Sequence, residues 1–211
     1  GHVVRKFSPD GQLLMTLGEP GVGGDDEYHF RSPTAVVTAP NGDIFVADGH
    51  FTSNRIVKYS KDGKFIKQWG KTGYGPGEFQ VPHCIAMDKR GRLFVCDRTN
   101  ARIQIFDQDG KFLGRWYQFG MPSGIAFSVN DDDLIYVFDS ESDNVENPGF
   151  EQGIRIGDAQ HGWVKHFILD QGGNPNTRTG SGPEFGAVDK HGNVFAGEPR
   201  PRVLRKYVKV R

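Results

Sequence analysis

The chain has 211 residues, and its 26 basic and 26 acidic side chains give a formal net charge of zero. This balance gives no sign of a nucleic-acid partner, and no apolar run approaches the roughly 18 residues that cross a bilayer, so neither a nucleic acid nor a membrane is expected as a partner. The 29 glycines, 12 prolines and 16 phenylalanines indicate many short strands joined by tight turns rather than packed helices.

The first predicted elements are two outer strands within residues 1–17, joined by an Asp-Gly turn. Each of the repeats that follow opens at a proline and turns at a pair such as Asn-Gly or Arg-Gly. The second run of each repeat is apolar and ends in an acid: DIFVAD, RLFVCD, LIYVFD and NVFAGE. Such apolar runs predict strands that are covered on both faces. There are four repeats, at about residues 30–70, 79–117, 121–169 and 183–211.

The third run of each repeat is predicted at NRIVKYS, ARIQIFD, GWVKHFIL and RVLRKYV, in residues 54–60, 101–107, 162–169 and 202–208. A tight turn and a fourth run follow in the first two repeats. The third and fourth runs alternate apolar residues with lysine, arginine or glutamine, which predicts strands near the outside. The longest insertion, residues 140–153 together with 170–182, is polar and rich in glycine and proline, and it predicts surface loops.

This repetition predicts an all-β propeller in which each repeat is one blade of four strands. We expect residues 1–211 to form a single propeller domain of about four and a half blades. The last repeat ends after its third strand, and the N-terminal pair matches the end of a preceding blade. One to one and a half further blades are therefore expected upstream of this sequence.

The two cysteines, Cys84 and Cys96, fall on neighbouring strands of one predicted hairpin. We interpret them as two small buried hydrophobic residues, with a cross-strand disulfide as the alternative. This usage does not settle the redox compartment.

One face of the predicted propeller collects polar side chains from the ends of the second strands and from the residues after the repeat prolines. Because the first strand is innermost, Thr34, His83, Ser123 and Glu184 are expected to ring the mouth of a central channel. A polar ring of this kind predicts a binding or catalytic site. The polar residues expected on this face include Asp48, His50, Asp97, Arg98, Ser123, Glu141, Glu184 and Arg200.

His83 and Glu184 occupy equivalent positions in their repeats, so both are expected to point toward the same axis. An imidazole together with a carboxylate suits a divalent metal such as zinc, although a catalytic zinc usually takes three protein ligands. The alternative is a histidine bonded to neighbouring backbone and a solvated glutamate at the rim.

At VPHCIAMDKRG and VCDRTNARIQIF the chain closely resembles the peptidyl-α-hydroxyglycine α-amidating lyases, which are six-bladed NHL-type propellers. The similarity runs from about residue 29 to residue 117, and the later blades resemble bacterial relatives of the same family. The resemblance implies cleavage of a C–N bond in a peptidyl-α-hydroxyglycine, which releases glyoxylate and a peptide amide. It implies a small-molecule or peptide substrate and slightly favours an extracellular or periplasmic location.

The resemblance also implies site residues, because that family holds zinc with three histidines in Pro-His pairs. It implies zinc as the cofactor, with a structural calcium as a further expectation, His83 as one ligand and Glu184 in place of another. It implies that Arg98 orients the substrate carboxylate. His50 stands near the family's tyrosine base and either takes the proton-transfer role or is an ordinary loop residue. The residues expected to bind substrate are Asp48, Asp97, Ser123, Glu141 and Arg200.

Two other functions compete with the lyase. A non-catalytic NHL propeller would use the loop face as a scaffold that binds a protein or peptide, so a protein partner is the alternative expectation. Hydrolysis of a small ester or lactone is the third possibility, and the sequence offers no specific pattern for it.

Overall fold

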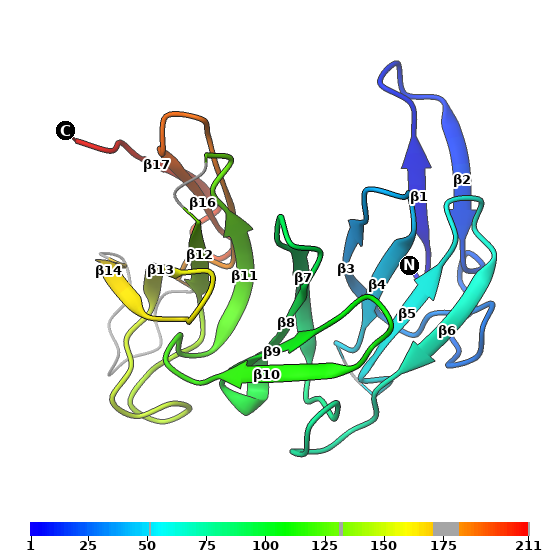
Figure 1. The fold of residues 1–211 in the computed structure, drawn as a ribbon, viewed down its shortest axis with the longest axis horizontal. Coiled ribbons are helices and arrows are strands. Elements are labelled where there is room, and N and C mark those ends of the chain that lie inside the picture. Colours follow the sequence, from blue (N-terminus) through cyan, green and yellow to red (C-terminus); the bar gives the residue numbers. More distant parts are fainter. Residues whose placement is uncertain (51, 131–132, 171–181, 211) are drawn as a thin grey trace. The chain divides into compact units, whose positions relative to one another are not determined.

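The computed structural model describes residues 1–50, 52–130, 133–170 and 182–210, which form seventeen strands and one short 3-10 helix, η1 (Arg98–Asn100) (Figure 1). The strands make five sheets, so the predicted all-β class is confirmed. Most of the polar insertion at 170–182 lies outside the described residues. No helix in the described ranges is long and apolar enough to cross a membrane. The chain divides into two compact units, Gly1–Val95 with Gln104–Leu113 and Cys96–Ile103 with Gly114–Arg211.

The N-terminal sheet has two strands, as predicted, and the next two sheets have four strands each in chain order. The N-terminal sheet pairs β1 (Val4–Phe7) with β2 (Leu13–Leu17). The second sheet comprises β3 (Pro33–Thr38), β4 (Ile44–Asp48), β5 (Arg55–Tyr59) and β6 (Phe65–Trp69). The third comprises β7 (Pro82–Met87), β8 (Leu93–Asp97), β9 (Arg102–Phe106) and β10 (Phe112–Trp116), and the boundary between the units runs through it.

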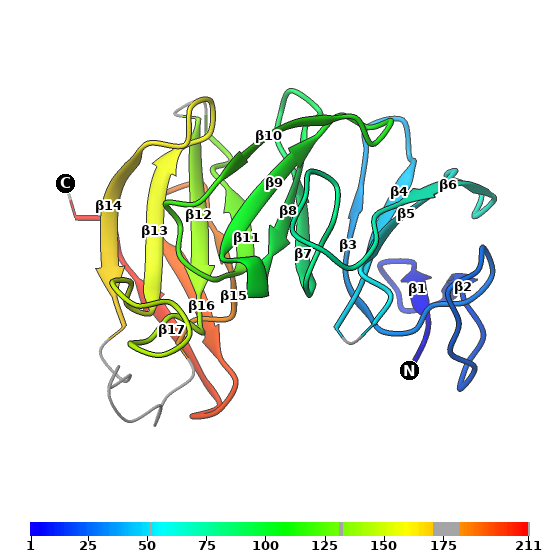
Figure 2. The ribbon, with the colours of Figure 1, turned by 90° about the horizontal axis from the view of Figure 1, so that it is seen from below.

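The second unit contains a further four-stranded sheet and a three-stranded sheet. The strands β11 (Pro122–Phe127), β12 (Leu134–Asp139), β13 (Gly153–Asp158) and β14 (Val164–Leu169) lie side by side in Figure 2. The last sheet comprises β15 (Phe185–Val188), β16 (Val194–Glu198) and β17 (Val203–Tyr207). The last repeat therefore stops at its third strand, as its sequence predicts.

The predicted third strand at residues 162–169 is wrong, because this segment contains the fourth strand of its sheet. The third strand is β13, which pairs with β12 along its whole length, from Asp158 opposite Leu134 to Gly153 opposite Asp139. Its sequence, GIRIGD, resembles a loop because two glycines dilute the apolar pattern. The structure requires small residues there: a Cβ atom added at Gly157 would lie 2.8 Å from Cζ of Phe119.

The expectation that third strands lie near the outside is also wrong for β5 and β9. Every residue of both strands is buried, including Arg55 and Lys58. These charges are buried because each has an anionic partner, with Lys58 Nζ 3.3 Å from Asp43 Oδ2. The predicted alternation is confirmed for the fourth strands β6 and β10, whose residues alternate between partly buried and exposed.

Both cysteines are disulfide-bonded, so the interpretation as two unbonded hydrophobic residues is wrong. Cys84 lies on β7 and Cys96 on β8, which are neighbours in one sheet. Neighbouring strands can bring Cβ atoms within about 5 Å, close to the separation that a disulfide needs.

Candidate active site

The second strand of each blade ends in an acid that is paired with an arginine of the third strand. The paired nitrogen and oxygen atoms are 3.0 Å apart in the first blade, 2.6 Å in the second and 2.9 Å in the third. The four acids are at most 2% exposed, so each pair holds two strands together in a position with little water. The pairs are Asp48–Arg55, Asp97–Arg102, Asp139–Arg155 and Glu198–Arg205.

In the first unit, Asp48 also fixes the loop that leads into β3. Its carboxylate accepts hydrogen bonds from the backbone N–H groups of Arg31 and Ser32, with Oδ1 2.7 Å from the Ser32 nitrogen. Arg55 donates to backbone carbonyls of the same loop, including that of His29 at 2.6 Å. Asp97 is similarly enclosed, since it accepts from Asn100 Nδ2 at 2.8 Å. These contacts of the two predicted substrate-binding acids lie within their own blades.

His29, in the loop that Asp48 fixes, carries a titration prediction. Its Nδ1 lies 2.9 Å from Asp26 Oδ1 and its Nε2 lies 3.4 Å from Glu19 Oε2, so both nitrogens face carboxylates and favour the imidazolium. The hydrogen bond to Asp26 raises the pKa of His29 above its ordinary 6.5.

Because the pKa of His29 is raised in the folded state, its interaction with Asp26 stabilises the fold. This stabilisation is fully present below the pKa of the unfolded state, and it is lost as pH rises through the pKa of the folded state. An NMR titration of the His29 ring protons should give a midpoint above 6.5. Asp26→Asn should lower that midpoint. An unchanged midpoint in this variant would show that Asp26 does not hold the proton.

In two blades the residue after the repeat proline sits at a distortion of the first strand. The register of β3 shifts between Pro33 and Ala35, and that of β11 shifts between Pro122 and Gly124, so Thr34 and Ser123 are bulged residues. A bulge re-aims its side chain and is common next to functional sites. This local geometry supports the prediction that the position after the proline is used, although Thr34 itself donates to the backbone oxygen of Pro82 at 2.7 Å.

The structure brings together the two predicted histidines of the first unit. His83 follows Pro82 at the start of β7, and His50 follows β4 by two residues. Their ring centroids are 5.8 Å apart with an interplanar angle of 52°. His83 is partly buried and His50 is exposed. The pair therefore offers two adjacent imidazoles, the side chain best suited to proton exchange near neutral pH, at the end of two inner strands.

Arg98 is the central residue of the predicted site in the second unit. Its Nη1 atom lies 3.6 Å from Glu184 Oε1 and 3.9 Å from Glu141 Oε1, and its side chain is only 13% exposed. Burial lowers the pKa of the guanidinium, which the two carboxylates oppose, and an arginine nevertheless stays charged at neutral pH. Both ion-pair distances exceed hydrogen-bond length. Within the described residues Arg98 donates no side-chain hydrogen bond.

A short chain of hydroxyl groups leads to this arginine. Ser123 Oγ and Ser140 Oγ are 2.8 Å apart, and Ser140 Oγ is 3.3 Å from Glu141 Oε1. Both serines are at most 2% exposed. They hold Glu141, and through it the guanidinium of Arg98, against a buried polar floor. Arg200, the remaining predicted residue, lies in the exposed turn after β16.

The described residues contain no group of three or more His, Cys, Asp and Glu side chains that could hold a metal ion. The expected ligands His83 and Glu184 belong to different units, and Glu184 pairs with Arg98. A catalytic zinc normally takes three protein ligands. Two ligands are fewer than such a site takes, so zinc at His83 stays a prediction from the sequence.

Sequence reasoning missed two features of the site. The arginine near the start of each third strand was visible in NRI, ARI and GIRI, but its pairing with the acid of the second strand appears only when the strands are aligned. The second is the contact of Ser140 with Ser123, which depends on the bulge in β11.

The chain is similar to a known protein family and to several named proteins. The family model DUF5128, described as a 6-bladed beta-propeller, matches residues 25–143. Peptidyl-alpha-hydroxyglycine alpha-amidating lyase 1 of Drosophila melanogaster is 35% identical over 98% of this chain and 41% of its own length. NHL repeat-containing protein 3 of Homo sapiens is 39% identical over 51% of this chain and 32% of its own length. The chain thus spans less than half the length of either relative.

Solved structures agree with the fold. A catalytically inactive virginiamycin B lyase from Staphylococcus aureus with quinupristin matches 98% of this chain and 63% of its own, with a TM-score of 0.62 and 17% identity. The WD40 propeller domain of Doa1 matches 96% of this chain and 56% of its own, with a TM-score of 0.62 and 14% identity. At these identities the likeness concerns the fold alone.

Proposed function

The chain belongs to the six-bladed β-propeller family DUF5128, and from this premise we propose that it is lyase-like and cleaves the C–N bond of a peptidyl-α-hydroxyglycine. The proposal draws on the alignment of 98% of this chain with 41% of a relative named for that activity. In this reaction the α-hydroxyl group loses its proton and a carbon–oxygen double bond forms. The C–N electron pair passes to the amide nitrogen, which takes up a proton. Glyoxylate and a peptide amide account for all atoms of the substrate.

The environment of the Arg98 guanidinium is the observation that carries the proposal. A guanidinium that is 13% exposed and donates no hydrogen bond within the described residues has donors available for a ligand. Unsatisfied buried donors are costly, and a carboxylate satisfies a guanidinium with two parallel hydrogen bonds. The α-hydroxyglycine end of the substrate carries such a carboxylate. In this proposal Arg98 binds it, while Glu141 and Glu184 hold the guanidinium in place.

The proton acceptor remains a prediction from the sequence. His50 is our choice because its ring is exposed and lies near that of His83, and an imidazole is a suitable general base. Zinc at His83 likewise remains a prediction, and a zinc ion at a substrate hydroxyl would supply Lewis-acid polarisation.

The direct test is to incubate the protein with an N-acyl peptidyl-α-hydroxyglycine and to measure glyoxylate and the peptide amide in equal amounts. Metal content is measured on the same preparation, with His83→Ala as the matched variant. The proposal fails if the peptide binds and no glyoxylate appears. That outcome would favour a non-catalytic scaffold, in keeping with the similarity to NHL repeat-containing protein 3.

A further inference from the structure

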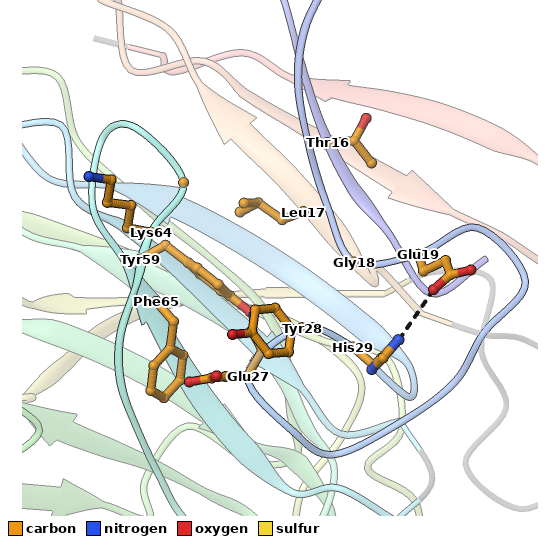
Figure 3. A pocket seen from close by; sticks show the side chains of 11 residues that line it. Thr16, Leu17, Gly18, Glu19, Glu27, Tyr28, His29, Tyr59, Lys64 and Phe65 are labelled. Carbon is orange, nitrogen blue, oxygen red and sulfur yellow. Dashed lines mark hydrogen bonds and ion pairs between the residues drawn. The ribbon is translucent and has the colours of Figure 1, made fainter.

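A pocket of about 620 Å³ lies in the first unit, and none of the residues assigned to the candidate active site lines it (Figure 3). It is lined by the end of β2, by residues 27–29 of the following loop, and by the turn between β5 and β6. Its volume is in the range of about 300–1,000 Å³ that is typical of small-ligand sites.

In this pocket a leucine stands where the fourth strands of the next two sheets have a tryptophan. The fourth strands β6 and β10 end in Trp69 and Trp116, whereas β2 ends in Leu17. Trp69 packs so closely on the turn glycine of the next blade that a Cβ atom added at Gly110 would lie 2.8 Å from its Cδ2. The equivalent glycine of the first blade, Gly63, faces Leu17 instead. The smaller side chain leaves the space between strands unfilled.

The walls of the pocket combine aromatic rings with a carboxylate. Figure 3 shows the carboxylate of Glu27 beside the rings of Phe65 and Tyr28, with Tyr59 behind them. The Tyr59 ring is fixed by an edge contact with Phe65 at 6.1 Å and by its hydroxyl, which donates to the Glu27 carbonyl oxygen at 3.1 Å. Glu27 has no ion-pair partner among the described residues.

The other charges in the pocket are separated from Glu27. Glu19 is already engaged, because its Oε2 faces His29 Nε2 at 3.4 Å (Figure 3). Lys64 stands at the opposite end of the pocket from Glu19. Glu27 is therefore the carboxylate with which a cationic ligand can form an ion pair. The aromatic rings around it also favour a cation.

We propose that this pocket binds the arginine side chain of a peptide. The guanidinium would form paired hydrogen bonds with Glu27 and would lie against the rings of Tyr28 and Phe65. A planar, weakly hydrated cation stacks on aromatic rings and matches a carboxylate better than an ammonium does. The apolar surfaces of Leu17 and Tyr59 are suited to cover the methylene stem.

The test is an NMR titration of the isotope-labelled protein with a blocked Gly-Arg-Gly peptide. Amide signals of Leu17 and Lys64 should shift, and analogues with citrulline or lysine in place of arginine should bind about tenfold and several-fold more weakly, respectively. Equal affinity for the citrulline peptide would overturn the proposal, because that side chain keeps the shape without the charge. Equal affinity for the lysine peptide would overturn the assignment of a planar cation.

Three variants separate this site from non-specific attraction. Leu17→Trp should abolish binding by placing in the pocket the residue that β6 and β10 carry at the equivalent position, and its unfolding midpoint reports that the variant is folded. Glu27→Gln should weaken binding about tenfold. Lys64→Gln should leave binding unchanged or strengthen it, because it removes a like charge. Unchanged binding in Glu27→Gln would contradict the proposal, and glyoxylate release should be unaffected in all three variants.

Discussion

Replacement of Arg98 by lysine is expected to lower kcat/KM for glyoxylate release by about 10²–10³-fold, the usual effect of removing one charge-stabilising donor from an active site. A lysine keeps the positive charge but cannot form the two parallel hydrogen bonds of a guanidinium, and its shorter head group would be drawn toward Glu184 and Glu141. The measurement is steady-state glyoxylate production by the purified variant.

The control for this variant is Arg115→Lys. Arg115 is an exposed arginine on β10 of the same blade, and its guanidinium lies over the ring of Tyr117. This change should leave kcat/KM unaltered. Addition of guanidinium ion to Arg98→Ala should restore part of the lost rate if the missing group is the carboxylate-binding donor. An Arg98→Lys enzyme with wild-type kcat/KM would remove Arg98 from the mechanism.

Asp48→Asn is expected to lower the free energy of unfolding by about 3–5 kcal/mol, the usual cost of breaking a buried ion pair at one partner. The variant leaves the Arg55 guanidinium, of which the side chain is 4% exposed, without its anion. It also weakens the hydrogen bonds that hold Arg31 and Ser32 just ahead of β3. Chemical denaturation followed by tryptophan fluorescence measures this loss.

The matched control is Lys71→Gln, which removes one partner of an exposed ion pair. Lys71 Nζ lies 3.1 Å from Glu78 Oε1, and its side chain is 75% exposed. Exposed pairs contribute about 0–1 kcal/mol, so this variant should unfold close to wild type. If Asp48→Asn were no more destabilising than Lys71→Gln, Asp48 would be free for a role in substrate binding instead of a structural one.

The local sequence pattern was sufficient for most of the fold. Proline-led apolar runs and glycine turns predicted the strands of the first two blades, and the matching N-terminal pair predicted β1 and β2. These predictions succeeded because the signals are short-range: backbone conformation at a turn and apolar periodicity depend on adjacent residues. The pattern failed at β13, where glycines needed for close packing imitate a loop.

The candidate site was predictable in outline. The sequence assigned His50, His83, Arg98, Glu141 and Glu184 to one face and paired His83 with Glu184. The contact of His50 with His83, and those of Arg98 with Glu141 and Glu184, came from the structure. The sequence could not reveal that Arg98 lacks hydrogen-bond partners among the described residues, since that depends on distances between three separate loops.

The sequence by itself determined the repeat and the strands of the first two four-stranded sheets. The tertiary structure decided which charges are structural and which are available to a ligand. Asp48 and Arg98 look equally functional in the sequence. Asp48 is enclosed by an ion pair and backbone donors, whereas Arg98 donates no side-chain hydrogen bond within the described part of the chain. The same holds at Leu17, where one smaller side chain opens a pocket. The physical reason is that the free energy of a buried charge or an unfilled space is set by its neighbours in three dimensions, which a repeat pattern does not encode.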